Sequence, residues 1–112
     1  MYVLANAFSI GMIDNDATIS FHRASLNEVK EKLSNNNFKS IVGHQTTAEF
    51  LSELIGVEVQ VNREMYKLKK DDILIVAQLK QRLPEGKVLS KEEVEEMYNK
   101  GFVEFWEVKI IR

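Results

Sequence analysis

The feature that most constrains the fold is a run of five apolar residues at 73–77 (Ile-Leu-Ile-Val-Ala). In a β-strand, alternate side chains point to opposite faces, so both faces of this run are apolar. Such a strand is expected in the middle of a sheet that is covered on both sides. The polar segments 70–72 and 78–87 flank the run and mark its ends. We therefore expect the fold to be built around one central strand at 73–77.

Three segments carry the sequence pattern of a helix start, in which a hydroxyl residue is followed three positions later by glutamate. The pattern occurs at 25–28, 46–49 and 90–93, with Thr46 as the expected capping residue of the middle segment. Apolar residues recur at helical spacing behind each start. Gly56 follows the second segment, as a glycine that ends a helix does. The expected helices are 25–34, 46–55 and 90–100.

Strands are expected where short apolar or alternating stretches lie between polar ones. In 18–22 the alternation predicts that Ile19 and Phe21 face inward and that His22 faces outward. The other expected strands are 2–8, 39–43, 57–61, 66–69 and 102–111. Helices interleaved with strands favour an α/β or α+β fold, with one mixed sheet of about five strands and about three helices. A chain of 112 residues fits a single domain, 1–112.

Charge and composition exclude several classes of function. The chain has 15 basic and 17 acidic residues, whereas a nonspecific binder of long nucleic acid usually carries a basic excess, so DNA is not an expected partner. It has no cysteine and its two histidines, His22 and His44, lie far apart, so no metal or other cofactor is expected. No apolar run approaches the roughly 20 residues that span a membrane. Together with a start that lacks a basic region, this favours a cytoplasmic protein.

The first candidate site is the segment Gly43-His44-Gln45-Thr46, at an expected junction between strand and helix. Backbone N–H groups at a helix start are unpaired and carry partial positive charge, which suits a phosphate. A glycine lets the backbone approach a ligand closely. If Thr46 caps the helix, the His44 side chain is left for another task. Taken alone, however, a single histidine is more often an ordinary polar residue of a junction loop.

The second candidate site is the polar segment that follows the central strand. In sheets with parallel strands, ligands bind beyond the carboxyl ends of the strands. The planar guanidinium of Arg82 suits a phosphate, Gln78 can hydrogen-bond a base or a ribose, and Glu85 can orient a histidine. The alternative is a solvated charged loop, which such a segment more often is.

The sequence contains three short motifs, at 6–9 (Asn-Ala-Phe-Ser), 43–47 (Gly-His-Gln-Thr-Thr) and 81–90 (Gln-Arg-Leu-Pro-Glu-Gly-Lys-Val-Leu-Ser). Together they resemble motifs of the viral anti-CRISPR ring nucleases and of their relatives in cellular type III CRISPR loci. The resemblance runs in order over nearly the whole chain and ends with Tyr98 and the aromatic segment 102–106. Each motif is weakly specific, but their ordered combination is stronger. Members of this family degrade cyclic tetra-adenylate without metal. They act as homodimers, with the ligand in a pocket across the dimer axis.

The resemblance implies roles for individual residues. His44 corresponds to the catalytic histidine, and Arg82 and Glu85 to the arginine and glutamate of the family's Arg-Leu-x-Glu-Gly motif. Gly11 stands where some relatives carry a polar side chain, so the resemblance does not imply a ligand contact at that position. The candidate ligand-binding residues are Asn6, Ser9, Gly43, Gln45, Thr46, Gln78 and Gln81.

The chemistry of such a reaction agrees with this set of residues. RNA supplies its own nucleophile, the ribose 2′-hydroxyl, so the protein needs an acid for the leaving oxygen and a cation for the phosphoryl oxygens.

Two alternative functions stay open. The same pocket could bind a cyclic nucleotide without cleaving it, as a sponge or sensor. A small viral regulatory protein is the other, but it would predict a basic helix, and the helices expected at 25–34 and 90–100 are mixed or acidic.

Overall fold

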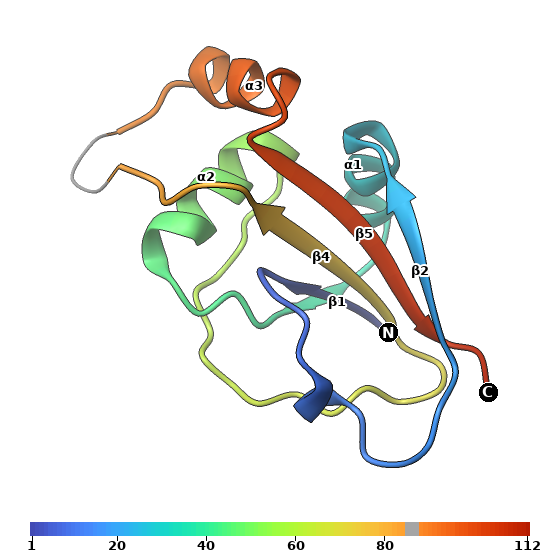
Figure 1. Cartoon of the computed structure of the whole chain (residues 1–112). Helices are drawn as coiled ribbons and strands as arrows, with labels where there is room; N and C mark the ends of the chain where they lie inside the picture. Colours follow the sequence, from blue (N-terminus) through green and yellow to red (C-terminus); the bar gives the residue numbers. More distant parts are fainter. Residues whose placement is uncertain (85–87) are drawn as a thin grey trace.

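The computed structural model describes residues 1–84 and 88–112 and contains one mixed sheet of five strands in the order β2-β5-β4-β1-β3 (Figure 1). The expected α+β fold, with one sheet and three α-helices, is confirmed. The strands are β1 (Tyr2–Ala5), β2 (Ile19–Ala24), β3 (Phe38–Ser40), β4 (Ile73–Leu79) and β5 (Val103–Ile110). The helices are the short 3-10 helix η1 (Ile10–Met12), α1 (Leu26–Asn35), α2 (Gln45–Ile55) and α3 (Lys91–Asn99).

Strand β4 is central and buried on both faces, as its sequence predicts. Ile75 and Ala77 pack in a core with buried residues of α1, α2 and α3, on what we call the helix face. Leu74 and Val76 pack on the opposite side, which we call the loop face because the segments 8–13 and 66–68 cover it. Burial of apolar side chains on both faces stabilises the strand, at about 25 cal/mol per Å² of apolar surface removed from water.

The middle strands of the sheet run parallel, which fixes where their ends lie. β1 pairs in parallel with β3 on one side and with β4 on the other, with Leu4 opposite Ser40 and Ala5 opposite Val76. β5 pairs with β4 and β2 in the antiparallel sense. The carboxyl ends of β1, β3 and β4 therefore meet at one edge of the sheet, on the left in Figure 1. We call this the carboxyl edge.

Two expected strands, 57–61 and 66–69, are not formed; only Val61 makes an isolated parallel bridge, with Val42. Side chains, rather than a neighbouring strand, pair with part of this backbone. The Ser52 hydroxyl accepts from the Val59 N–H at 2.8 Å, and the Ser40 hydroxyl donates to the carbonyl of Gln60 at 2.6 Å. The alternation of apolar residues here reflects a loop that buries some of its side chains. Such side-chain bonds compete with strand pairing.

Two details at the sheet margins differ from the sequence prediction. The strand expected over 2–8 ends at Ala5. Phe21, expected to face inward, is 53 % exposed. β2 is an edge strand, and the segments that cover the loop face do not fully cover it. His22 is exposed, as its sequence predicts.

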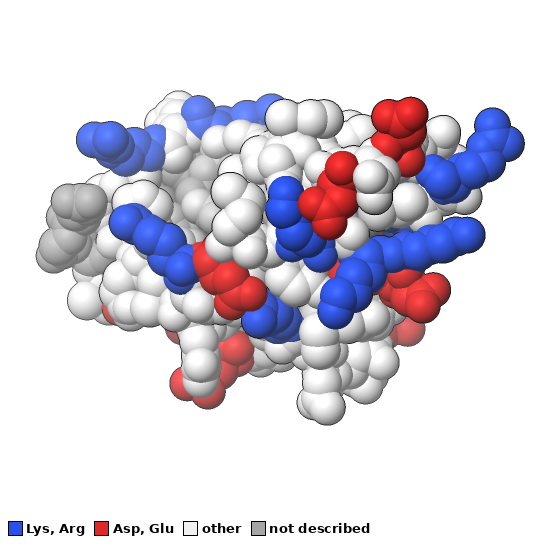
Figure 2. Space-filling view, turned by 90° about the horizontal axis from the view of Figure 1, so that it is seen from below, with Lys and Arg blue, Asp and Glu red and all other residues white. Residues whose placement is uncertain are grey.

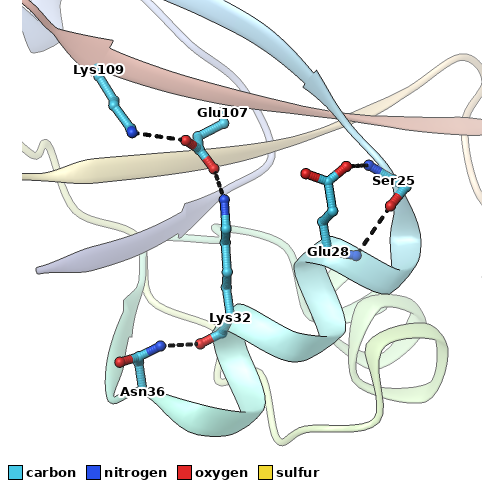
Figure 3. A network of polar contacts seen from close by, with 6 residues as sticks. All are labelled: Ser25, Glu28, Lys32, Asn36, Glu107 and Lys109. Atoms are coloured by element: carbon cyan, nitrogen blue, oxygen red, sulfur yellow. Dashed lines mark hydrogen bonds and ion pairs between the residues drawn. The ribbon is translucent and has the colours of Figure 1, made fainter.

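The first turn of α1 carries the expected capping box (Figure 3). The Ser25 hydroxyl accepts from the Glu28 N–H at 3.1 Å, and the Glu28 carboxylate accepts from the Ser25 N–H at 3.0 Å. The bond from the Ser25 backbone is the largest cause that lowers the pKa of Glu28. The box expected at Ser90 is likewise formed, at the start of α3. Both helix starts were therefore readable from sequence.

A buried carboxylate joins α1 to the sheet on the helix face (Figure 3). Glu107 of β5 is 8 % exposed and forms ion pairs with Lys32 of α1 and with Lys109, the latter at 3.1 Å. Burial by itself raises the pKa of Glu107, but the hydrogen bonds and charges of the two lysines outweigh it and hold this pKa below its usual value. The bond to Glu107 in turn raises the pKa of Lys32. A buried charge with two partners is retained in its ionised form.

Replacing Glu107 with glutamine is expected to lower the free energy of unfolding at pH 7 by about 1–3 kcal/mol, because Lys32 and Lys109 lose their charged acceptor. The pKa of Glu107 in the folded chain is lowered from 4.5, so the stabilisation by its carboxylate is present above that pH and is lost as pH falls through the folded pKa. The difference between Glu107→Gln and the parent should therefore shrink in acid, as measured by urea unfolding over a pH series.

The matched control for this prediction is Glu31→Gln, which changes an exposed carboxylate of α1. It should alter the free energy of unfolding by less than about 0.5 kcal/mol at any pH. A Glu107→Gln deficit of constant size down to strongly acidic pH would contradict the assignment.

Candidate functional site

The carboxyl edge places most of the predicted site residues on one side of the molecule. Asn6 follows β1 directly, Gly43 and His44 join β3 to α2, and Arg82 follows β4. The three segments come from distant parts of the sequence, and the parallel pairing of β1 brings them together. Ligands bind at such edges in sheets of this type. Glu85 lies outside the described residues.

His44 is the N-terminal capping residue of α2, which corrects the sequence prediction that Thr46 caps this helix. The helix begins at Gln45, and the backbone carbonyl of His44 accepts the first helical bond, from the Ala48 N–H at 2.9 Å. The earlier start is supported by a bond from the Gln45 amide to the Glu49 carboxylate at 2.9 Å, one turn along. Thr46 is therefore inside the first turn.

The imidazole of His44 does not serve the helix that it precedes. Within the described residues it makes no capping hydrogen bond, and the residue is exposed. The N–H groups of the first turn of α2 thus receive no acceptor from the His44 side chain. They keep the partial positive charge of a helix N-terminus, and an anion is the ligand that such a terminus favours.

Arg63 is a residue of this region that sequence reasoning missed. Its guanidinium donates to the carbonyl of Gly43 at 3.4 Å, beside His44. A Cβ built on Gly43 would meet atoms of the Arg63 side chain at 3.7 Å. The contact arises because the Asn62 N–H bonds to the Val42 carbonyl at 2.8 Å and draws this loop alongside the strand-to-helix junction. No sequence motif marks Arg63, and only the fold reveals its place.

The segments that contain His44 and Arg82 also line a common cavity next to the carboxyl edge. Thr46 of the first turn of α2 and Leu83, next to Arg82, line one cavity of about 280 Å³. Its other lining residues are Glu49, Phe50, Glu53, Pro84, Val88, Leu89 and Val94. Leu83 is buried in the core of the helix face, and it therefore anchors the segment after β4 close to α2.

Among the remaining candidates, Gln78 and Ser9 lie toward the loop face. Gln78 is inside β4 rather than in the loop expected there, and within the described part of the chain its exposed amide donates one hydrogen bond, to the Leu79 carbonyl at 3.4 Å. Ser9 is the exposed capping residue of η1, Gln81 is exposed and Asn6 is half-buried. The segments of His44 and Arg82 thus meet at the carboxyl edge, whereas Gln78 and Ser9 belong to the loop face.

A network of charges borders this region on β4 and β5. Glu104 forms ion pairs with Lys80 at 2.6 Å and with Arg23 at 2.9 Å. The hydrogen bond from Lys80 is the largest cause that lowers the pKa of Glu104, and the charge of Arg23 adds to it. Both cations are therefore compensated by a carboxylate. Positive charge that is not committed to this carboxylate is supplied at the edge by Arg63 and Arg82.

The surface has no broad positive area on the face shown in Figure 2, where lysine and arginine are interspersed with aspartate and glutamate. Residues 1–84 and 88–112 contain no group of three or more potential metal-ligating side chains of His, Cys, Asp or Glu. In the same ranges no helix has the length and apolarity needed to cross a bilayer.

Comparison with known proteins places this arrangement in a family. The model of the STIV B116-like family matches residues 2–105. The chain belongs to the STIV B116-like family. Every predicted site residue lies within the matched range.

Relatives of the chain come from archaeal viruses and from a bacterium. B116 of Sulfolobus turreted icosahedral virus has the same fold, with a TM-score of 0.88 and 33 % identity over 96 % of this chain and 97 % of the solved one. Protein 26 of a Sulfolobus islandicus filamentous virus is 35 % identical over 102 residues (91 % of this chain, 85 % of the relative). ORF117 of Acidianus two-tailed virus is 37 % identical over 101 residues (88 % and 85 %). YddF of Bacillus subtilis is 33 % identical over 75 residues (65 % and 69 %).

Because His44 caps α2 without a side-chain bond, replacing it with asparagine is expected to stabilise the fold. The asparagine oxygen can accept from a first-turn N–H, which should raise the free energy of unfolding by about 0.5–2 kcal/mol. His44→Ala provides no acceptor and is the control. Thermal and urea unfolding would measure both, and equal stabilities for the two variants would show that position 44 is not the cap.

Proposed function

We propose that this protein is a ring nuclease that cleaves cyclic tetra-adenylate into linear di-adenylates with 2′,3′-cyclic phosphate ends, without a metal or other cofactor. The observation that carries the proposal is that the segments of His44 and Arg82 both leave the sheet at the carboxyl edge, and that Thr46 and Leu83 of these segments line one cavity. In this role the protein would switch off type III CRISPR signalling in the cytoplasm of the host cell. Its ligand is a small cyclic RNA, and no long nucleic acid or membrane is involved.

The positive end of α2 and the arginines support binding of a phosphodiester at this edge. The first-turn N–H groups at Gln45 and Thr46 offer donors to phosphoryl oxygens. The guanidinium of Arg82 can donate two parallel bonds to a phosphate, and Arg63 adds a second cation beside Gly43. The donors at Gln45 and Thr46 are fixed by the first turn of α2, so these two need little reorganisation when charge builds up in the transition state.

The reaction needs one acid and an aligned nucleophile. The 2′-oxygen of a ribose attacks the adjacent phosphorus in line and loses its proton to water, so the new 2′-O–P bond forms as the P–O5′ bond breaks. His44 donates a proton to the departing 5′-oxygen. Arg82 stabilises the negative charge on the phosphoryl oxygens. Glu85, by the family resemblance, holds the imidazole, and Asn6, Ser9, Gln78 and Gln81 position the ribose and base.

A homodimer completes this proposal. His44, Gln78 and Arg82 are all exposed in the single chain, so a ring bound at the carboxyl edge would remain open to water. A twofold dimer provides two identical sites, and a ring of four equal nucleotides can place two opposite linkages in them. Two cuts then give two di-adenylates. The second subunit would also exclude water from both sites, which strengthens the interactions of the charged groups.

Replacing His44 with asparagine is expected to slow cleavage by about 10²- to 10⁴-fold, because the leaving oxygen loses its proton donor. Binding should change far less, and the variant should remain folded because asparagine is a better cap. The measurement is single-turnover cleavage of labelled cyclic tetra-adenylate in EDTA, with chromatography of the products. His22→Asn, at the other and exposed histidine, is the matched control and should cleave at the parental rate.

Two results would contradict the proposal. Cleavage by His44→Asn at the parental rate would remove His44 as the acid. Binding of cyclic tetra-adenylate by the parent without any product would make the protein a sponge or sensor rather than an enzyme.

A further inference from the structure

An aromatic hollow on the loop face has no role in the proposed chemistry. It has a volume of about 280 Å³ and lies over three neighbouring strands. The register aligns its walls, with Phe21 of β2 opposite Val108 of β5 and Val76 of β4 opposite Trp106 of β5. Its lining residues are Phe8, Phe21, Val76, Gln78, Trp106 and Val108.

The rings of this hollow are held by contacts with one another and with Arg23. Phe8 and Phe21 pack edge to face, with ring centroids 5.4 Å apart and planes at 90°. The Arg23 guanidinium lies over the Trp106 ring, 5.3 Å from its centroid, and Glu104 fixes that guanidinium at 2.9 Å. Such contacts order the aromatic walls before any ligand binds. Even so, Phe21 remains 53 % exposed, so a large apolar surface is left open.

Gln78 is the lining residue of the hollow with a polar side chain, and it belongs to the candidate site. The amide of Gln78 is exposed at the carboxyl end of β4 and only has the 3.4 Å contact with Leu79 in the described structure. A carboxamide offers one donor and one acceptor side by side, which match N6 and N7 of adenine. Phe8 links the hollow to the same site from the other side, because Ser9 follows it directly.

We propose that this hollow binds one adenine base, stacked on the aromatic walls and read by the Gln78 amide. The inference rests on the proposed function, in that the base belongs to a nucleotide of the cyclic ligand whose phosphate lies near α2. The volume of about 280 Å³ is at the lower limit of ligand pockets, which suits one base rather than a dinucleotide. A phosphate is a poor occupant, because the nearby cations Arg23 and Lys80 already share the carboxylate of Glu104.

The hollow contains its own reporter, since Trp106 is the single tryptophan of the chain. The experiment titrates the His44→Asn variant with cyclic tetra-adenylate and follows tryptophan fluorescence. Saturable quenching is expected, because a base stacks against the hollow that the indole lines. Phe21→Ala should weaken binding by about 5- to 150-fold, the loss of one stacked base. The matched control is Ile111→Ala, which changes an exposed apolar residue just after the C-terminal end of β5. This variant should bind cyclic tetra-adenylate as tightly as the His44→Asn parent.

A second titration uses AMP and UMP with the parent chain, and it does not depend on ring cleavage. The parent should bind AMP more tightly than UMP, and Gln78→Ala should lose most of that preference. Quenching by AMP that depends on Phe21, in a chain that leaves the ring intact, would support the hollow and contradict the proposed function.

The opposite pattern would overturn the hollow and leave the enzyme proposal in place. It consists of ring cleavage by the parent with no quenching by either ligand and no weakening in Phe21→Ala.

Discussion

The parallel pairing of β1 with both β3 and β4 is the constraint on which the site depends. It brings the segments after the three strands to one edge, although they lie at 6–9, 41–44 and 80–84 in the sequence. The pairing is held by the burial of β4 on both faces, since its alternate side chains belong to two separate cores. A loss of packing on either face would therefore disturb the placement of His44 relative to Arg82.

The two faces of the sheet differ in what covers them and in the groups that they expose. The helix face carries the larger core and anchors α2, whose N-terminus offers backbone donors at His44 and beyond. The loop face is covered by irregular segments and leaves the rings around Phe21 open. The two proposals therefore place phosphate chemistry and base recognition on different sides of the sheet. The family membership and the match to B116 show that the chain shares its fold with a protein of an archaeal virus.

How much the sequence predicts depends on the range of the interaction. The central strand at 73–77 and the capping boxes at Ser25 and Ser90 were readable, because each depends on neighbouring residues. The cap of α2 was misplaced at Thr46, since Thr46 and Glu49 reproduce the capping pattern two residues inside the true helix. Local patterns carry no information on which of two possible starts the tertiary structure uses.

Long-range features were beyond the reach of the sequence. The segment 57–61 alternates like a strand, but its backbone bonds to Ser40 and Ser52. Arg63 joins the site through a contact between distant segments. Phe21 is exposed because it lies on an edge strand that the neighbouring segments do not fully cover, and a sequence pattern does not show which strand is at the edge. The motifs around His44 and Arg82 were found from sequence, and their common edge follows from a strand order that periodicity does not specify.

The most direct test of the shared edge is a map of where the ligand binds. Amide chemical shifts of isotope-labelled His44→Asn would be recorded with and without cyclic tetra-adenylate. The account predicts that the largest changes fall in 6–9, 43–47 and 78–83, the segments that meet at the carboxyl edge. Changes centred instead on the groove beside β3, which Asn36, Asn37 and Gln60 line, would contradict it.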